Sequence, residues 1–87
     1  MERKNEMIRF YVTDGLPYAS MEDKYHFIDN EPVAVKVGVV DVSKYYGEKY
    51  EVFWDFGFDT IKMARTNSKS EAIHLFRDWL KCAVYCA

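Results

Sequence analysis

The chain has 87 residues, of which 49% are hydrophobic and 17% aromatic, and its formal net charge is −2. This length fits one domain, so residues 1–87 are expected to fold as a single compact unit, and the apolar content excludes extended disorder. No apolar run is long enough to cross a membrane, and the charged start MERKNEMIRF lacks the apolar stretch of a signal peptide. We therefore expect a cytoplasmic protein.

Strand patterns recur along most of the chain. Four segments either alternate between apolar and polar residues or are rich in valine, which favours strands: residues 7–12, 32–42, 49–56 and 60–66. Gly38, in the middle of the second segment, indicates a bulge or a close backbone approach. The residues between the second and third segments, SKYYGEK, predict a hairpin loop with Gly47 near its tip.

Alternation divides the side chains of the third segment between two faces. One face holds Tyr50, Val52, Trp54 and Phe56. We expect this face to pack against a helix, which leaves Phe53 on the opposite face of the sheet, among polar neighbours.

Residues 16–31 have the least regular pattern. Within them, SMEDKYHFI fits a short helix, with Ser20 as its N-cap and acidic residues in its first turn. A strand centred on KYHFI fits the same letters. We predict a short helix or an irregular loop here.

The C-terminal segment has the pattern of an amphipathic helix, from about residue 69 to residue 85. Ser68 followed by Glu71 is a capping box, in which each side chain accepts a hydrogen bond from the other residue's backbone N–H. The apolar face holds Ala72, Ile73, Phe76, Trp79, Leu80 and Ala83. Cys82 and Cys86 are spaced so that their Cβ atoms lie about 5–6 Å apart in a helix, which is too far for a disulfide, so we expect free thiols.

These elements predict the α+β class: an antiparallel β-meander of three to four strands with one C-terminal amphipathic helix packed on one face. An isolated hairpin would be marginally stable, whereas three strands with a helix can stand alone. Because the helix covers one side only, the other face of the sheet is expected to be open.

Asp55-Phe56-Gly57 spells the magnesium-binding motif of protein kinases. That motif needs a glycine-rich loop, a strand lysine and a catalytic loop around it, and none of these patterns occurs in the sequence. We therefore interpret it as the end of a strand and the start of a turn. The one close cysteine pair supplies only half of the four ligands of structural zinc. We expect no catalysis, no metal and no cofactor.

Charge is unevenly distributed in the first half of the chain. Residues 14–31 contain five carboxylates and one lysine. The carboxylates are those of Asp14, Glu22, Asp23, Asp29 and Glu31. Such a segment is either ordinary solvated surface or a feature that steers a charged partner toward the protein.

Aromatic residues supply a second candidate for binding. Tyr45 and Tyr46 lie in the hairpin loop, and tyrosine is enriched in binding interfaces, although capping of a small core is the alternative. Phe53 either touches the segment 16–31 or is exposed for a partner. Together with the carboxylates, these residues predict an interface with a larger protein or nucleoprotein complex, for a chain that is a monomer or a homodimer.

A meander followed by a helix that starts TNSKSEAIHLFRDWL resembles the arm-binding N-terminal domain of tyrosine integrases, over residues 49–81. In that family the sheet enters the major groove, so the resemblance implies DNA binding, for which Lys62, Arg65 and Lys69 are the candidates. The strands of this chain lack that family's dense Lys/Arg pattern, and a net charge of −2 opposes phosphate contacts.

In its size, acidity and small meander with one helix, the chain is similar to many phage-encoded inhibitors of host defence, anti-CRISPR proteins among them. Such proteins act by occupying a surface of a larger complex. The resemblance therefore implies a stoichiometric inhibitor in the host cytosol, and it carries over no site residue. This is our first hypothesis. DNA binding is the second, and a structural subunit that dimerises through the open sheet face is the third.

Overall fold

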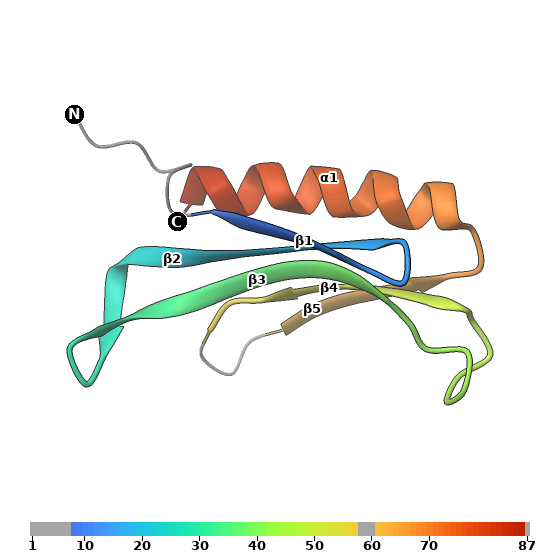
Figure 1. Ribbon diagram of the computed structural model, residues 1–87, viewed down its shortest axis with the longest axis horizontal. Helices are drawn as coiled ribbons and strands as arrows, with labels where there is room; N and C mark the ends of the chain where they lie inside the picture. Colours follow the sequence, from blue (N-terminus) through green and yellow to red (C-terminus); the bar gives the residue numbers. More distant parts are fainter. Residues whose placement is uncertain (1–7, 58–60, 87) are drawn as a thin grey trace.

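The computed structural model describes residues 8–57 and 61–86, although the side chains of residues 23–26, 85 and 86 lie outside this description. Its elements are β1 (Arg9–Thr13), β2 (Leu16–Ile28), β3 (Glu31–Asp41), β4 (Tyr50–Asp55), β5 (Ile61–Thr66) and α1 (Lys69–Cys86). The strands form one antiparallel sheet in the order β1-β2-β3-β4-β5, and α1 lies along one face of it (Figure 1). The predicted α+β meander with a C-terminal helix is confirmed, with one strand more than expected.

The additional strand is β2, so the prediction of a short helix or an irregular loop for residues 16–31 was wrong. Turns at both ends decide the conformation. Asp14 and Gly15 (φ 54° and 76°) close the turn between β1 and β2, and Asp29 and Asn30 (φ 53° and 67°) close the turn between β2 and β3. Two successive positive φ angles are typical of the tight turn that matches the twist of a hairpin. The turns therefore hold this segment in antiparallel register, against the helical pattern of residues 20–28.

From Tyr18 to Glu22, burial along β2 follows the period of two that a strand requires, and Leu16 at the start of the strand is also buried. Ala19 and Met21 face α1 and are buried, whereas the residues on either side of each are half-buried. The pairing with β3 shifts between Glu22 and Phe27. Tertiary packing of alternate residues, rather than local propensity, selects the strand.

The core lies between α1 and the sheet. The sheet contributes Leu16, Ala19, Met21, Val35, Val37, Val39 and Val52, and the helix contributes Ala72, Phe76, Trp79 and Ala83. Tyr50 and Trp54 pack against this core, which confirms the predicted helix-facing side of β4. Phe56 lies beyond the end of that strand, with its ring centroid 4.6 Å from that of Trp54.

The cap at the start of α1 differs from the predicted capping box in one bond. The Glu71 N–H donates to Ser68 Oγ at 3.2 Å, as expected. The Glu71 carboxylate, however, accepts from the Thr66 hydroxyl, and the Ser68 N–H donates to Thr66 Oγ1 at 3.1 Å. Thr66, the last residue of β5, therefore connects the sheet to the first turn of the helix.

The hairpin loop between β3 and β4 lies where it was predicted. It begins with a turn in which Asp41 Oδ1 accepts from the Ser43 hydroxyl at 2.7 Å and from the Ser43 N–H at 2.9 Å. These two bonds stabilise the ionised carboxylate, so they lower the pKa of Asp41. The Val42 N–H donates to the Lys49 carbonyl at 2.8 Å, which closes the base of the loop.

Candidate functional site

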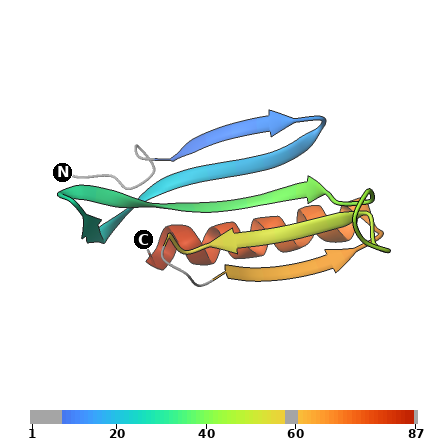
Figure 2. The ribbon, with the colours of Figure 1, turned by 90° about the horizontal axis from the view of Figure 1, so that it is seen from below.

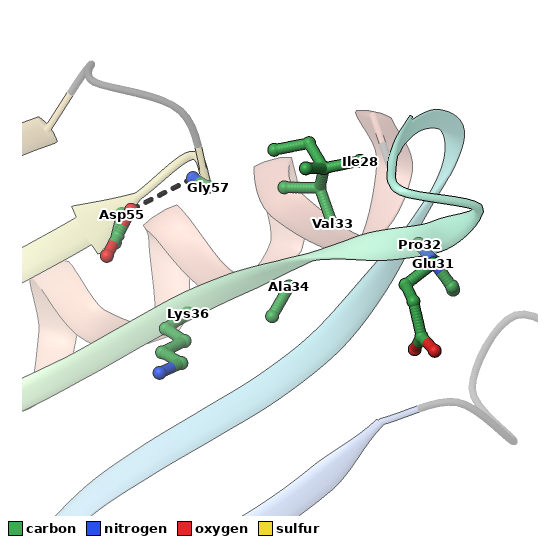
Figure 3. Close-up of a pocket in the computed structure, with 8 residues that line it drawn as sticks. All are labelled: Ile28, Glu31, Pro32, Val33, Ala34, Lys36, Asp55 and Gly57. Carbon is green, nitrogen blue, oxygen red and sulfur yellow. Dashed lines mark hydrogen bonds between the residues drawn. The ribbon is translucent and has the colours of Figure 1, made fainter.

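Asp55-Phe56-Gly57 forms the turn at the end of β4. The Gly57 N–H donates to Asp55 Oδ1 at 2.9 Å, so the carboxylate stabilises the turn (Figure 3). Gly57 has a φ of 90°, and a Cβ on it would lie 2.1 Å from Val33 Cγ1 and 2.6 Å from the Ala34 carbonyl oxygen. The backbone conformation and the close approach of β3 both require glycine. These contacts support the interpretation of the motif as a structural turn.

A hollow of about 380 Å³ lies beside this turn (Figure 3). Its wall includes Lys36 and Asp55, which are cross-strand partners on β3 and β4. The Asp55 carboxylate already accepts the Gly57 N–H, and Glu31 points away from both charged groups in Figure 3. The charged groups that line this hollow therefore do not converge on one point, as a site for a small polar ligand would require.

The face of the sheet opposite α1 carries an aromatic row. Tyr11, Tyr18, Gly38, Phe53 and Met63 are successive cross-strand partners, one from each strand. Their neighbours along the strands face the helix, so alternation places all five on the other side. Ring centroids are 5.4 Å apart for Tyr11 and Tyr18, and 6.2 Å apart for Tyr18 and Phe53. These are contact distances for aromatic pairs. We call this set the open-face row.

Gly38 makes the row continuous. A Cβ on Gly38 would lie 2.8 Å from two ring carbons of Phe53 and 2.9 Å from Tyr18 Cδ1. The two rings therefore cover the glycine from both sides. The register with β2 and β4 is regular through this position, so the predicted bulge is absent, and the nearest atoms belong to side chains rather than to the predicted close backbone. The close approach is by aromatic rings, since both lean over the space that a side chain would fill.

Arg65 connects the β3–β4 loop to this face. Arg65 Nε donates to Glu51 Oε1 at 2.9 Å, and these residues are cross-strand partners next to the open-face row. The Arg65 guanidinium also lies 3.6 Å from the centre of the Tyr46 ring. Tyr46 is therefore held beside the sheet by a cation–π contact.

The open face is exposed within the part of the chain that the structure describes. Tyr11, Ile61 and Met63 are 46%, 53% and 53% exposed. No element among residues 8–57 and 61–86 lies over this side, and Figure 1 shows α1 on the other side of the sheet. This face therefore presents a patch of large apolar side chains with a charged border.

The predicted acidic residues do not form one cluster. Asp14 is in the turn before β2, whereas Asp29 and Glu31 lie at or just beyond the turn after it. Because Tyr18 to Ile28 runs alongside only Glu31 to Gly38 of β3, the two ends of β2 are separated by roughly 30 Å. Alternation with Met21 places Glu22 on the open face, half-buried. The side chain of Asp23 lies outside the described residues.

The predicted aromatic residues are closer to one surface. Phe53 lies on the face away from α1, as predicted, and it touches Tyr18, which belongs to the segment 16–31. Tyr46 borders the same face through Arg65. Tyr45 projects from the loop and is 78% exposed. The aromatic part of the predicted interface is therefore assembled, and the acidic part is distributed along the molecule.

The basic residues proposed for DNA contact lie on different surfaces. Lys62 is on the helix side, with its Nζ 4.9 Å from the centre of the Trp79 ring. Arg65 is on the open face, in the ion pair with Glu51. Lys69 is the first residue of α1, and its Nζ approaches Gly15 in the turn between β1 and β2. The three side chains therefore do not present one surface to a phosphate backbone.

Sequence reasoning missed three members of the row: Tyr11, Tyr18 and Met63. The signal was present in the alternation of the first and last strands and in the tyrosine content. Tyr18, however, belongs to the segment that was assigned to a helix or loop. Without the register of β2, Tyr11 and Phe53 could not be placed in one row with Tyr18.

The remaining chemistry-bearing side chains are on the helix. His74 Nε2 lies 3.4 Å from Asp78 Oδ2, in an exposed contact one turn apart. Cys82 is a free thiol, as predicted, but it is exposed and not partly buried, and the side chain of Cys86 lies outside the described residues. Among the described residues, no three His, Cys, Asp or Glu side chains are grouped as metal ligands. The one helix in the described part of the chain is too polar to cross a membrane.

The fold and the open-face row define a small α+β protein in which one sheet face is not covered by any element of residues 8–57 and 61–86. No protein-family model, no curated protein and no solved structure matches the chain.

Proposed function

We propose that the chain is a non-catalytic protein-binding module that blocks a larger complex stoichiometrically. The observation that supports this best is the open-face row, which presents aromatic and apolar side chains from four strands on an uncovered face. Interface cores are enriched in tyrosine, phenylalanine and methionine, and exposed apolar patches of this kind mark interaction sites.

The arrangement of the face suits a protein surface. Tyr18 and Phe53 are half-buried rings at its centre, already packed on each other, so little conformational freedom is lost when a partner covers them. Charged groups surround them, among them the Glu51–Arg65 pair. A hydrophobic centre with a polar border is the usual anatomy of an interface.

Charge suggests the chemistry of the partner. Asp14 at one end of β2, and Asp29 and Glu31 at the other, are all exposed. Carboxylates at both ends of a long molecule would steer it toward a basic surface. Proteins that handle nucleic acid present such surfaces, so we propose a nucleic-acid-handling complex of the host-defence type, met in the cytoplasm of a host cell.

The test compares variants of the open-face row with a matched control on the opposite layer. The parent protein is immobilised and used to capture partners from a lysate, and each captured protein is then measured against Phe53→Ala, Tyr18→Ala and His74→Ala. His74 is on the outer surface of α1, with its side chain 75% exposed. We expect His74→Ala to bind as the parent does, and each ring variant to dissociate at least tenfold faster.

Two results would overturn the proposal. If both ring variants bind the partner as tightly as the parent does, while their melting curves are unchanged, the interface is elsewhere. If the partner's activity persists at a molar excess of the bound protein, the module does not block it.

Direct DNA binding is the alternative function. It has less support, since Lys62, Arg65 and Lys69 do not share a surface. A mobility-shift assay on duplex DNA separates the two functions, because phosphate contacts give binding at low salt that weakens steeply as salt rises. We expect no shift. A salt-dependent shift that the double variant Lys62→Ala, Arg65→Ala abolishes would replace our first proposal.

A further inference from the structure

The first strand, β1, is an edge of the sheet that α1 does not cover. All five of its residues are exposed, and Phe10 and Val12, on the helix side, are 64% and 74% exposed. Figure 2 shows β1 at the border of the sheet, separated from the helix by β2 and β3. The other edge, β5, carries Lys62 and Arg65, as protected edges do.

Within its span β1 has little that blocks pairing, since Arg9 at its first position is its one charged residue. It contains no proline and no lysine, and its pairing with β2 runs without a bulge from Arg9 to Thr13. Exposed apolar edges of this kind are templates for another strand. An isolated edge with this composition therefore favours association.

The tight turn after β1 determines which backbone groups face outward. In a hairpin with a two-residue turn, the flanking residues, here Thr13 and Leu16, form a hydrogen-bonded pair, and such pairs alternate along the strand. The N–H and C=O groups of Tyr11 then face β2. Those of Phe10 and Val12 face away from the sheet and are available to a new strand.

We infer that two copies of this chain pair through their β1 strands, antiparallel about a twofold axis at Tyr11. This register places Phe10 opposite Val12 of the second copy, so the outward groups of both residues form hydrogen-bonded pairs. An aromatic ring opposite a β-branched side chain is a favourable cross-strand pair. Phe10 of each copy thereby covers Val12 of the other copy, and α1 leaves both of these side chains exposed.

The other positions of the register are also compatible. Tyr11 lies opposite Tyr11 of the second copy, which joins the open-face rows of the two copies into one. Arg9 lies opposite Thr13, so no like charges face each other. The axis at the centre of β1 pairs all five of its residues. Tyr11 belongs to both the edge and the open-face row. The inference nevertheless does not depend on the proposed function, because it rests on the outward backbone groups of Phe10 and Val12, whereas the proposed function rests on the rings of Tyr18 and Phe53.

The first experiment measures the oligomeric state across a concentration series by sedimentation. We expect the parent to pass from monomer to dimer as its concentration rises. Val12→Pro removes an outward N–H without removing a bond to β2, and edge strands tolerate proline at such positions. We expect this variant to remain monomeric with an unchanged melting curve, and His74→Ala on the outer surface of α1 to dimerise as the parent does.

The second experiment tests the register by cross-linking, in a background with Cys82→Ser and Cys86→Ser. Directly opposed Cα atoms at a non-hydrogen-bonded pair lie about 4.5 Å apart, within reach of a disulfide. Tyr11→Cys should therefore give a reducible dimer. Phe10→Cys places the two thiols on a diagonal, about 7–8 Å apart, and should cross-link much less.

The inference fails if the parent is monomeric at every concentration that stays soluble, if Val12→Pro dimerises as the parent does, or if both cysteine variants cross-link equally. Failure of the proposed function is distinguishable. In that case the ring variants Phe53→Ala and Tyr18→Ala keep the dimer and also keep the partner.

Discussion

Gly57→Ala tests how closely the turn after β4 packs on β3. The added methyl group would lie 2.1 Å from Val33 Cγ1 and 2.6 Å from the Ala34 oxygen, on a backbone with a φ of 90°. A left-handed backbone costs about 1–2 kcal/mol in a residue that has a Cβ. Overpacking in a filled site adds about 1–3 kcal/mol. We therefore expect the free energy of unfolding to fall by about 2–5 kcal/mol.

Two other glycines provide matched controls that separate these contributions. At Gly15 the φ is 76°, but the nearest atom to an added Cβ is Lys69 Nζ at 3.8 Å. Gly15→Ala should therefore cost only the backbone part, about 1–2 kcal/mol. At Gly47 the φ is not positive and no atom lies within 4 Å. Gly47→Ala should be neutral, or should stabilise by up to about 1 kcal/mol through the unfolded chain.

Urea denaturation followed by tryptophan fluorescence measures all three variants, because Trp54 and Trp79 both contact the core. The reasoning is refuted if Gly57→Ala costs no more than Gly15→Ala. That result would mean that β3 does not approach the turn as closely as the contacts of Gly57 imply.

Trp79→Ala removes a large ring from the centre of the helix–sheet interface and should cost about 3–5 kcal/mol in the same melts; a loss below about 1 kcal/mol would mean that another face of α1 is buried. Ser68→Ala should cost about 1 kcal/mol through the lost helix cap, and an unchanged stability would move the start of the helix. The pKa of Asp41 is lowered by the Ser43 hydroxyl and N–H, so its contribution to stability is present above the unfolded pKa near 3.8 and is lost as pH falls through the lowered folded pKa. Asp41→Asn should therefore flatten the acid side of a stability–pH curve, and a curve that keeps its slope would contradict the hydrogen bonds of the turn.

The class of fold was predictable because its strongest elements are local. The period of α1, its cap at Ser68 and the alternation in β4 each depend on residues a few positions apart. The strand β2 was not predictable in the same way. Residues 20–28 favour a helix locally, and what decides against the helix is the pair of turns at Asp14 and Asp29, together with packing partners far along the chain.

The candidate site was predictable only in part, for the same reason. Phe53 follows from alternation within one strand, but its contact with Tyr18 requires the register of three strands. The scatter of the acidic residues follows from the length of β2, which was not predicted. The helix-side position of Lys62 over Trp79 depends on how α1 crosses the sheet, and no local pattern encodes that.

The meander also has a consequence for how the protein comes to fold. Every strand pairs with its neighbour in the sequence, so the hairpins close short loops, and chains of low contact order fold quickly. The helix that covers the sheet follows all five strands. During synthesis, residues such as Val37 and Val52 therefore leave the ribosome before Phe76 and Trp79 exist to bury them. Docking of α1 is then the step that ends the exposure of the nascent sheet to aggregation and to chaperones.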